Sequence, residues 1–240
     1  MKILITNDDG INAEGIRVLA EWARRLGEVT VIAPKVEQSG KSHAIEFTHS
    51  FEIKRVDFAP GIEGWSVDST PADCVRFGFM GLHNRYDLVL SGINRGVNLG
   101  ADIVYSGTVG AIFEATRMNS RGIAISTYPD TLDGAAAELD RVFDYVKEHK
   151  LLEQNPLYNI NIPPKPLGLR ITRQGSPYFT DEFYQESGDM YIQQGHKISD
   201  VNPHDQTLDT VSVESGYISV TPLMATRTNM DLFRKLNGIG

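Results

Sequence analysis

The 240-residue sequence predicts an α/β fold built around a mostly parallel sheet. A strand, a helix and a second strand follow one another within the first 33 residues, and the same alternation returns between residues 86 and 162. After Pro166 short strand-like runs replace the helices. We therefore expect a catalytic core of residues 1–166 and a C-terminal β-rich extension of residues 167–240 that ends in a helix.

The amino-terminal unit has the clearest pattern. Residues 2–6 form a short, almost wholly apolar run, as expected of a strand buried on both faces. Between residues 12 and 26 the apolar positions recur at helical spacing, with Asn12 placed to cap the helix and Gly27 placed to end it. Residues 29–33 form the next strand. A unit of this kind has a right-handed crossover, and its two strands are parallel.

The remaining elements are expected from the same two periodicities. The segment 42–65 is β-like and mixed, which predicts an insertion or an antiparallel extension. The tail lacks a dense apolar core of its own, so it is better suited to packing on another subunit. In the core, strands are predicted at 86–91, 122–126 and 157–162 and helices at 108–118 and 134–149; in the tail, strands are predicted at 169–173, 190–194 and 217–221 and a helix at 229–236.

Composition excludes several classes of protein. The chain has 23 basic and 31 acidic residues, a net charge of −8, and no basic block, which argues against binding a nucleic-acid polymer. Cys74 is the only cysteine, so a disulfide within the chain is impossible. No run approaches the ~20 apolar residues of a membrane helix, and the start of the chain lacks the pattern of a signal peptide. These features predict a cytoplasmic protein with no membrane partner.

Three loops rich in oxygen-bearing side chains follow predicted parallel strands. They comprise residues 7–10, 37–40 and 92–96, and they contain Asp8, Asp9, Ser39 and Asn94. Ligands of an open parallel sheet bind at the carboxyl ends of its strands, where such loops emerge. The three loops are therefore expected to converge on one site.

The adjacent carboxylates Asp8 and Asp9 give that site its chemistry. Just beyond a strand the chain turns, helped here by Gly10, and both side chains can converge on one point. Two carboxylates held together repel each other unless a cation or a proton lies between them. A hard divalent ion, Mg²⁺ or Mn²⁺, suits these oxygen ligands. The alternative is that one Asp caps the next helix and the other is solvated.

A second cluster predicts an anion site on the same edge of the sheet. Glycines are dense between residues 91 and 111, and they let backbone N–H groups approach an anion closely. Ser106 and Thr108 add hydroxyl donors, and a predicted helix begins near Thr108 with its positive end toward the loop. Taken alone, this pattern is also typical of a capped turn.

Several ordered blocks together make the chain resemble the survival protein E (SurE) family of nucleotidases. The resemblance spans the whole chain. It is carried by Asn7-Asp8-Asp9-Gly10, Ala33-Pro34 followed by Gln38-Ser39-Gly40, Thr70-Pro71-Ala72-Asp73-Cys74-Val75, Ser91-Gly92-Ile93-Asn94, the block 105–110, the block 159–163 and the block 216–223.

The resemblance implies a Rossmann-like three-layer core and a metal-dependent phosphomonoester hydrolase, a 5′-nucleotidase similar to acid phosphatases. The implied substrates are nucleoside 5′-monophosphates, with 3′-monophosphates and short polyphosphate as further candidates. It also implies one divalent metal ion per subunit and a homodimer or homotetramer that exchanges C-terminal elements. Carried over by position, the metal ligands are Asp8, Asp9, Ser39 and Asn94, and the phosphate contacts are Asn98, Ser106, Gly107 and Thr108.

In the implied mechanism a metal-activated water is the nucleophile, and Asp8 or Asp9 accepts its proton, with Asp8 favoured. Two departures from the family pattern, at Ser69 and at residues 225–229, touch none of the proposed ligands. His43 is close to Ser39 in sequence, but the six histidines show no metal-binding spacing. Trp22, Trp65 and Cys74 are interpreted as packing residues.

Two rival functions follow from the same residues. A non-catalytic nucleotide-binding protein could use the same loops, although a pure phosphate cradle does not need two carboxylates. A Rossmann oxidoreductase is excluded, because the first strand leads into Asn-Asp-Asp-Gly rather than Gly-x-Gly-x-x-Gly. A phosphatase for sugar phosphates or polyphosphate stays open, since base recognition leaves no visible pattern in the sequence.

Overall fold

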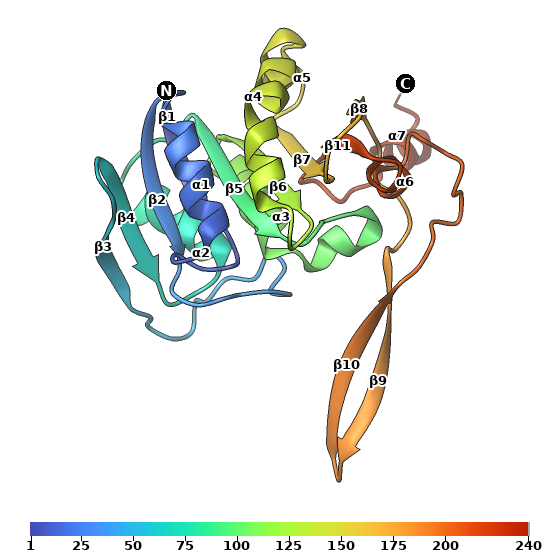
Figure 1. The fold of residues 1–240 in the computed structure, drawn as a ribbon, viewed down its shortest axis with the longest axis horizontal. Coiled ribbons are helices and arrows are strands. Elements are labelled where there is room, and N and C mark those ends of the chain that lie inside the picture. The colour runs from blue at the N-terminus through green and yellow to red at the C-terminus, as the bar shows by residue number, and fades with distance from the viewer. Residues whose placement is uncertain (240) are drawn as a thin grey trace.

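The computed structural model describes residues 1–239, and a nine-stranded sheet forms its centre (Figure 1). The spatial order of the strands is β3-β4-β2-β1-β5-β6-β7-β11-β8. The strands of this sheet are β1 (Lys2–Thr6), β2 (Glu28–Pro34), β3 (Ile53–Ala59), β4 (Ile62–Val67), β5 (Leu88–Arg95), β6 (Arg121–Thr127), β7 (Leu157–Ile162), β8 (Gly168–Ile171) and β11 (Tyr217–Pro222).

Helices cover both faces of the sheet, so the core has three layers (Figure 1). A π-helical segment, η1, and a 3₁₀ helix, η2, connect elements of the core. The helical elements are α1 (Glu14–Ala23), α2 (Pro71–Arg76), η1 (Phe77–Gly81), η2 (Gly100–Tyr105), α3 (Gly107–Arg117), α4 (Leu132–Glu148), α5 (Leu151–Gln154), α6 (Asp209–Glu214) and α7 (Met230–Asn237).

The alternation of side chains along β1 decides which helix lies on which face. Ile3 and Ile5 belong to the core cluster that includes the buried faces of α1 and α4. Leu4, between them in sequence, belongs to the cluster that includes residues of α2 and α3. Successive residues of a strand point to opposite faces, so both faces of β1 are buried, as its apolar sequence predicts.

The strands from β2 to β7 through the centre of the sheet are parallel. β1 pairs in parallel with β2 and β5, and β5, β6 and β7 continue the parallel arrangement. The antiparallel pairs are β3 with β4 and β11 with β7. The predicted Rossmann-like α/β class is therefore confirmed, and the segment 42–65 supplies part of an antiparallel edge.

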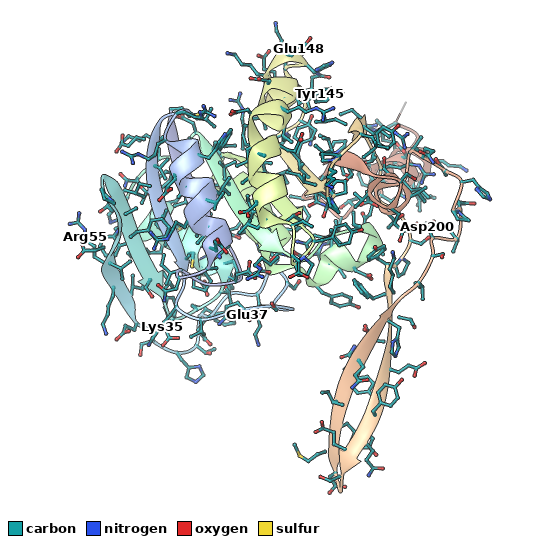
Figure 2. All side chains as sticks on the ribbon, viewed as in Figure 1. Lys35, Glu37, Arg55, Tyr145, Glu148 and Asp200 are labelled. Atoms are coloured by element: carbon teal, nitrogen blue, oxygen red, sulfur yellow. The ribbon has the colours of Figure 1, made fainter. Side chains whose placement is uncertain are left out.

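The C-terminal residues contribute both to this sheet and to a projecting arm. β11 and β8 extend the central sheet beyond β7. β9 (Phe179–Ser187) and β10 (Met190–Lys197) instead form a separate antiparallel hairpin that leaves the body of the molecule (Figure 1). Every residue of the hairpin strands is exposed, and Figure 2 shows their side chains directed into solvent. An isolated hairpin is only marginally stable in water.

The structure corrects several predicted boundaries. The first helix begins at Glu14, with Ala13 at the N-cap position and no side-chain cap, so the prediction that Asn12 caps it was wrong. The reason is a turn in which the Ala13 N–H donates to the carbonyl of Gly10 at 3.1 Å. The strand predicted to end at Ser91 continues to Arg95. Strand β9 and helix α6 were not predicted.

Among residues 1–239, no helix combines the length and the apolar character that crossing a membrane requires. The longest helix is α4, at 17 residues. Its buried positions recur at helical spacing and face the sheet, whereas most of its other positions are polar. The helix is therefore an amphipathic layer of the core.

The packing of α4 on the sheet gives a stability prediction. Leu139 is fully buried in the core cluster shared by α1 and α4. We expect Leu139→Ala to lower the free energy of unfolding by about 2–5 kcal/mol, because it removes buried methyl groups and leaves a cavity. Leu167, which is 70% exposed, is the matched control, and its change to alanine should cost under about 0.5 kcal/mol. Urea unfolding followed by circular dichroism measures both changes.

Candidate functional site

An acidic pocket lies at the carboxyl edge of the parallel strands. Its volume is about 360 Å³. It is lined by residues from the end of β1, the segment after β2, the end of β5, η2 and the base of the hairpin. Six of the predicted site residues line it, namely Asp8, Asp9, Ser39, Asn94, Asn98 and Ser106.

A tight turn after β1 places the two aspartates. The Asn7 side chain donates from Nδ2 to the Gly10 carbonyl at 2.9 Å and accepts from the Gly10 N–H at 3.2 Å. Gly10 has φ of +100°, a conformation that residues with a Cβ rarely adopt. The Asp8 carbonyl also accepts from the Gln38 N–H at 2.7 Å, which ties this turn to the segment after β2. Asn7 was not singled out from the sequence.

Asp8 is held by the first turn of α3. The Thr108 hydroxyl donates to Asp8 Oδ1 at 2.6 Å, and the Thr108 N–H donates to Oδ2 at 3.1 Å. Burial raises the pKa of Asp8, and the bonds from Thr108 oppose that rise only in part. Gly107 lies close by, since a Cβ added there would be 3.0 Å from Asp8 Cβ. Thr108 is fully buried and contacts Asp8 instead of lining the pocket.

Asp9 is also partly buried, and its titration is affected by the negative charge of Asp8. Burial, followed by repulsion from Asp8, raises the pKa of Asp9 to about 6. The Arg95 N–H donates to Asp9 Oδ2 at 3.3 Å, which offsets only part of this effect. A cation placed between the two carboxylates would remove the repulsion, so this pair fits a metal ion.

Ser39 and Asn94 complete a set of four oxygen donors. Ser39 Oγ donates to Glu37 Oε1 at 2.7 Å, and Asn94 Nδ2 donates to the Gly96 carbonyl at 2.6 Å. Because both side chains donate a hydrogen atom to these partners, the Ser39 hydroxyl oxygen and the Asn94 amide oxygen can still coordinate a cation. Within residues 1–239, no group of three or more His, Cys, Asp or Glu side chains is arranged to hold a metal. The candidate set is instead two carboxylates, a hydroxyl and an amide, which suits a hard ion.

The charge of the pocket favours a bound cation independently of these contacts. Five carboxylate side chains line it, against the single cationic side chain of Arg95. A phosphate monoester is itself an anion and would be repelled by such a surface without a counter-ion. The carboxylates are those of Asp8, Asp9, Glu37, Asp102 and Asp181, of which the last three were not predicted from the sequence.

The pocket is also lined by amide and hydroxyl groups. Ser106 is the N-cap of α3, and its Oγ accepts from the Val109 N–H at 3.1 Å, so its hydrogen is free to be donated elsewhere. Asn98 is fixed by two buried amides of β7, because its carbonyl accepts from Asn159 Nδ2 at 2.8 Å and from Asn161 Nδ2 at 2.9 Å. The Asn159-Ile-Asn161 alternation, with both amides on one strand face, is the signal that could have identified them.

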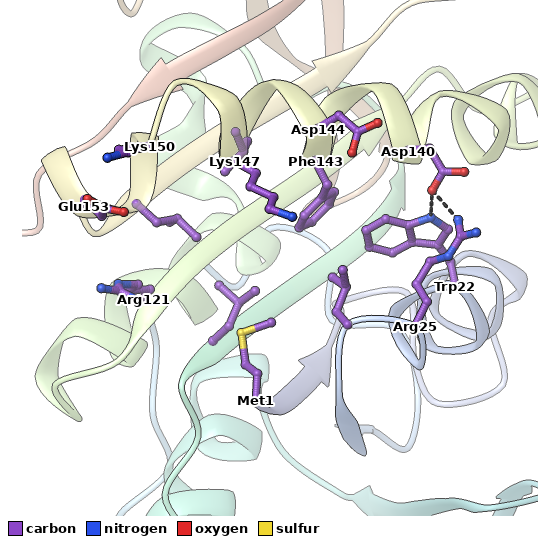
Figure 3. A pocket seen from close by; sticks show the side chains of 14 residues that line it. Met1, Trp22, Arg25, Arg121, Asp140, Phe143, Asp144, Lys147, Lys150 and Glu153 are labelled. Carbon is purple, nitrogen blue, oxygen red and sulfur yellow. Dashed lines mark hydrogen bonds and ion pairs between the residues drawn. The ribbon is translucent and has the colours of Figure 1, made fainter.

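The residues interpreted as packing are found in packing positions. Cys74 is fully buried in the core. Trp22 and Phe143 lie with their ring centroids 4.4 Å apart, and Trp22 Nε1 donates to Asp140 at 2.9 Å. They line a larger hollow of about 630 Å³ between α1 and α4, which contains Met1 at the other end of β1 (Figure 3). That hollow shares no residue with the acidic pocket.

The fold and the pocket first define a class: an α/β protein whose parallel sheet presents oxygen ligands and a helix amino terminus at one acidic edge. The chain belongs to the survival protein SurE family, whose model matches residues 3–181.

Similar proteins cover almost the whole chain. The 5′-nucleotidase SurE of Thermosipho melanesiensis is 37% identical over 249 residues, which covers 98% of this chain and 96% of that protein. The 5′-nucleotidase SurE of Legionella pneumophila is 36% identical and covers 100% of this chain and 97% of its own length. The crystal structure of the SurE protein from Aquifex aeolicus superimposes with a TM-score of 0.81 at 30% identity, covering 100% and 99% of the two chains.

The repulsion between the two aspartates gives a prediction that needs no substrate. In chelator, Asp9→Asn should raise the melting temperature, because the neutral amide removes a like charge beside Asp8. Adding Mn²⁺ should raise the melting temperature of the wild-type protein and leave that of the variant nearly unchanged. Thermal unfolding with and without Mn²⁺ measures both effects. Equal Mn²⁺ shifts in the two proteins would show that the ion binds elsewhere.

Proposed function

We propose that this chain is a phosphoric monoester hydrolase that removes phosphate from nucleoside 5′-monophosphates and uses one divalent ion, Mg²⁺ or Mn²⁺, per subunit. The observation that carries the proposal is the convergence of Asp8, Asp9, Ser39 and Asn94 in a pocket that also includes Ser106, the N-cap of α3. Membership of a family whose relatives are named 5′-nucleotidases supports the same substrate class. Nucleoside 3′-monophosphates and short polyphosphate are included as secondary substrates.

The four oxygen donors would hold the ion. When bound, a divalent ion supplies charge neutralisation for the phosphate and lowers the pKa of water. The chain contributes the geometry of its ligands, because Asp8 is oriented by two bonds from Thr108 and Asn94 by its bond to Gly96. In this role Thr108 acts on the reaction through Asp8.

Asp8 is the proton acceptor that we favour. Burial raises the pKa of Asp8, and a carboxylate with a raised pKa is a better base near neutral pH. The two bonds from Thr108 keep the carboxylate in one orientation. Asp9, which is more exposed, would then serve chiefly as a ligand.

The phosphate would lie in the same pocket, beside this carboxylate pair and Ser106 at the start of α3. Ser106 can donate its hydroxyl, Gly107 can donate its backbone N–H, and Asn98 lines the same pocket. The first N–H groups of a helix have no partners within the helix, and its positive end favours an anion. These donors would hold the phosphoryl oxygens as their charge changes in the transition state.

We further propose that the chain assembles as a homodimer or homotetramer through its C-terminal extension. The support is the number of apolar side chains that this extension exposes. They include Phe183, Met190 and Tyr191 on the hairpin and Leu232, Phe233 and Leu236 on α7, a helix with no buried residue.

Loss of one ligand tests the catalytic role of the pocket. We expect Asp9→Asn to abolish phosphate release from a nucleoside 5′-monophosphate with Mn²⁺, because the ion loses a charged ligand and the site loses its balance of charge. The variant should still fold and assemble, as measured by circular dichroism and light scattering. Asp144→Asn on α4 is the matched control and should keep wild-type turnover. Wild-type turnover by Asp9→Asn in chelator-treated buffer would refute the metal assignment.

A substrate panel tests the proposed substrate class. With Mn²⁺, release of inorganic phosphate should be fastest from nucleoside 5′-monophosphates and slower from 3′-monophosphates and tripolyphosphate. A sugar phosphate lacks the nucleoside and should be the poorest substrate, because part of the binding energy that lowers the barrier comes from groups remote from the phosphate. A sugar phosphate hydrolysed with a higher kcat/KM than any nucleotide would contradict the assignment.

A further inference from the structure

Ser39 lies in a segment with no regular secondary structure. Between the end of β2 at Pro34 and the start of β3 at Ile53, the chain contains only turns, bends and irregular backbone. No ladder of main-chain hydrogen bonds holds this segment, although the N–H of Gln38, the residue before Ser39, donates to the Asp8 carbonyl at 2.7 Å. The position of Ser39 must depend on contacts between this segment and neighbouring elements.

Contacts of Ser42 place the segment on η2 and on the first turn of α3. The Ser42 N–H donates to the Tyr105 carbonyl at 3.0 Å, and Ser42 Oγ donates to the Val104 carbonyl at 2.6 Å. A Cβ added at Gly110 would lie 2.3 Å from the Ser42 carbonyl oxygen, so the two backbones are in direct contact. Glycine at position 110 is needed for this close approach.

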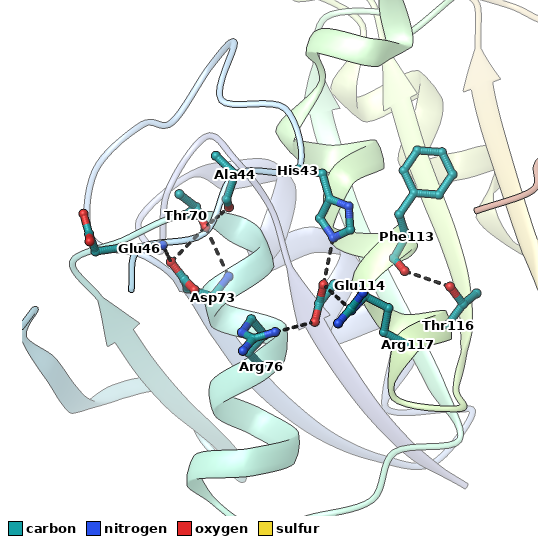
Figure 4. A network of polar contacts seen from close by, with 10 residues as sticks. All are labelled: His43, Ala44, Glu46, Thr70, Asp73, Arg76, Phe113, Glu114, Thr116 and Arg117. Atoms are coloured by element: carbon teal, nitrogen blue, oxygen red, sulfur yellow. Dashed lines mark hydrogen bonds and ion pairs between the residues drawn. The ribbon is translucent and has the colours of Figure 1, made fainter. Parts of the chain in front are cut away.

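The next residue, His43, lies within hydrogen-bonding distance of a buried carboxylate of α3. His43 Nε2 lies 2.8 Å from Glu114 Oε2, and Arg76 Nη1 of α2 lies 3.0 Å from Glu114 Oε1 (Figure 4). Glu114 is only 2% exposed, so it depends on these partners for compensation. Burial would raise the pKa of Glu114, but the bonds from His43 and Arg76 outweigh it and hold the pKa below its ordinary value.

Two further contacts bind the segment to α2. The Ala44 carbonyl accepts from Thr70 Oγ1 at 2.7 Å, and the Glu46 N–H donates to Asp73 Oδ2 at 2.8 Å (Figure 4). Residues 42–46 thus bridge α2 and α3. Because α3 also carries Thr108, which holds Asp8, the same helix supports both sides of the proposed cation site.

We propose that His43 is a positioning residue for the cation site: with Glu114 and Arg76 it fixes residues 39–46 on α2 and α3 and so sets the place of Ser39 beside Asp8 and Asp9. The inference rests on the proposed function, because it takes Ser39 as a cation ligand. His43 does not line the acidic pocket, so its effect reaches the ion through the intervening chain. A purely structural role would instead make His43 a stabiliser of buried Glu114 alone.

Three variants of the full chain separate these roles. His43→Ala removes the contact with Glu114, and His43→Gln keeps an N–H donor that can reach it. His49→Ala is the matched control, since the His49 side chain is 83% exposed in the same segment. The measurements are the Mn²⁺ affinity by titration calorimetry, the melting temperature in chelator, and kcat and KM for a nucleoside 5′-monophosphate.

We expect His43→Ala to weaken Mn²⁺ binding by roughly tenfold, as is typical for the loss of a group that orients a ligand. Below saturating Mn²⁺ the loss should appear in kcat more than in KM. His43→Gln should recover most of the affinity, and His49→Ala should match the wild type. Unchanged Mn²⁺ affinity in a folded His43→Ala protein overturns the inference, whatever happens to its melting temperature.

A second variant covers the case in which His43→Ala does not fold. Glu114→Gln keeps the shape of the side chain and removes the charge that attracts His43. Weaker Mn²⁺ binding by this variant supports the positioning role, and wild-type binding overturns it. A wild-type protein without phosphatase activity refutes the proposed function instead, because Mn²⁺ affinity is measured without substrate.

Discussion

The structure depends on keeping two like charges together at the end of a buried strand. Asp8 and Asp9 follow β1, whose residues from Ile3 to Thr6 are fully buried, so their backbone cannot move apart without disturbing the centre of the sheet. The Asn7–Gly10 turn and the bonds from Thr108 direct the side chains toward one point. Burial raises the pKa of both carboxyl groups, and repulsion from Asp8 raises that of Asp9 further, which is the electrostatic state that a cation relieves.

The rest of the fold places the other residues of the pocket beside Asp8 and Asp9. The parallel sheet brings the ends of β1, β2 and β5 to one edge, and the amino-terminal end of α3 lies there. The carboxylates and the amino-terminal end of α3 are thus placed side by side. Under the proposed function, the carboxylates would attract the cation and the positive end of the helix would attract the phosphate, so both ligands could occupy the pocket.

Much of this arrangement was accessible from the sequence, because it depends on local patterns. The strand periodicity of β1, β2 and β7 and the order of the oxygen-rich loops predict the parallel sheet and the convergence of Asp8, Asp9, Ser39 and Asn94. The resemblance to a known family added the residue roles. Those roles stay predictions, although the pocket contains six of the eight residues.

What the sequence did not reveal depends on contacts between distant segments. The bonds from Thr108 to Asp8 join residues 100 positions apart, and no local pattern distinguishes this use of a hydroxyl from a phosphate contact. Strand β9 was missed because all of its residues are exposed, so no buried face marks it. Asn12 was assigned as a cap from residue type alone, whereas the turn at Gly10 shifts the start of α1.

The base of the hairpin is attached to the wall of the acidic pocket at Asp102. Asp102 of η2 accepts from the N–H groups of Tyr178 and Phe179 at 2.7 and 2.9 Å, and Phe179 and Asp181 at the start of the arm form part of the pocket wall. Because Phe179 and Asp181 belong both to strand β9 and to the pocket wall, the hairpin cannot tilt at this point without changing the pocket. The exposed hairpin and the pocket wall are therefore mechanically coupled through these residues.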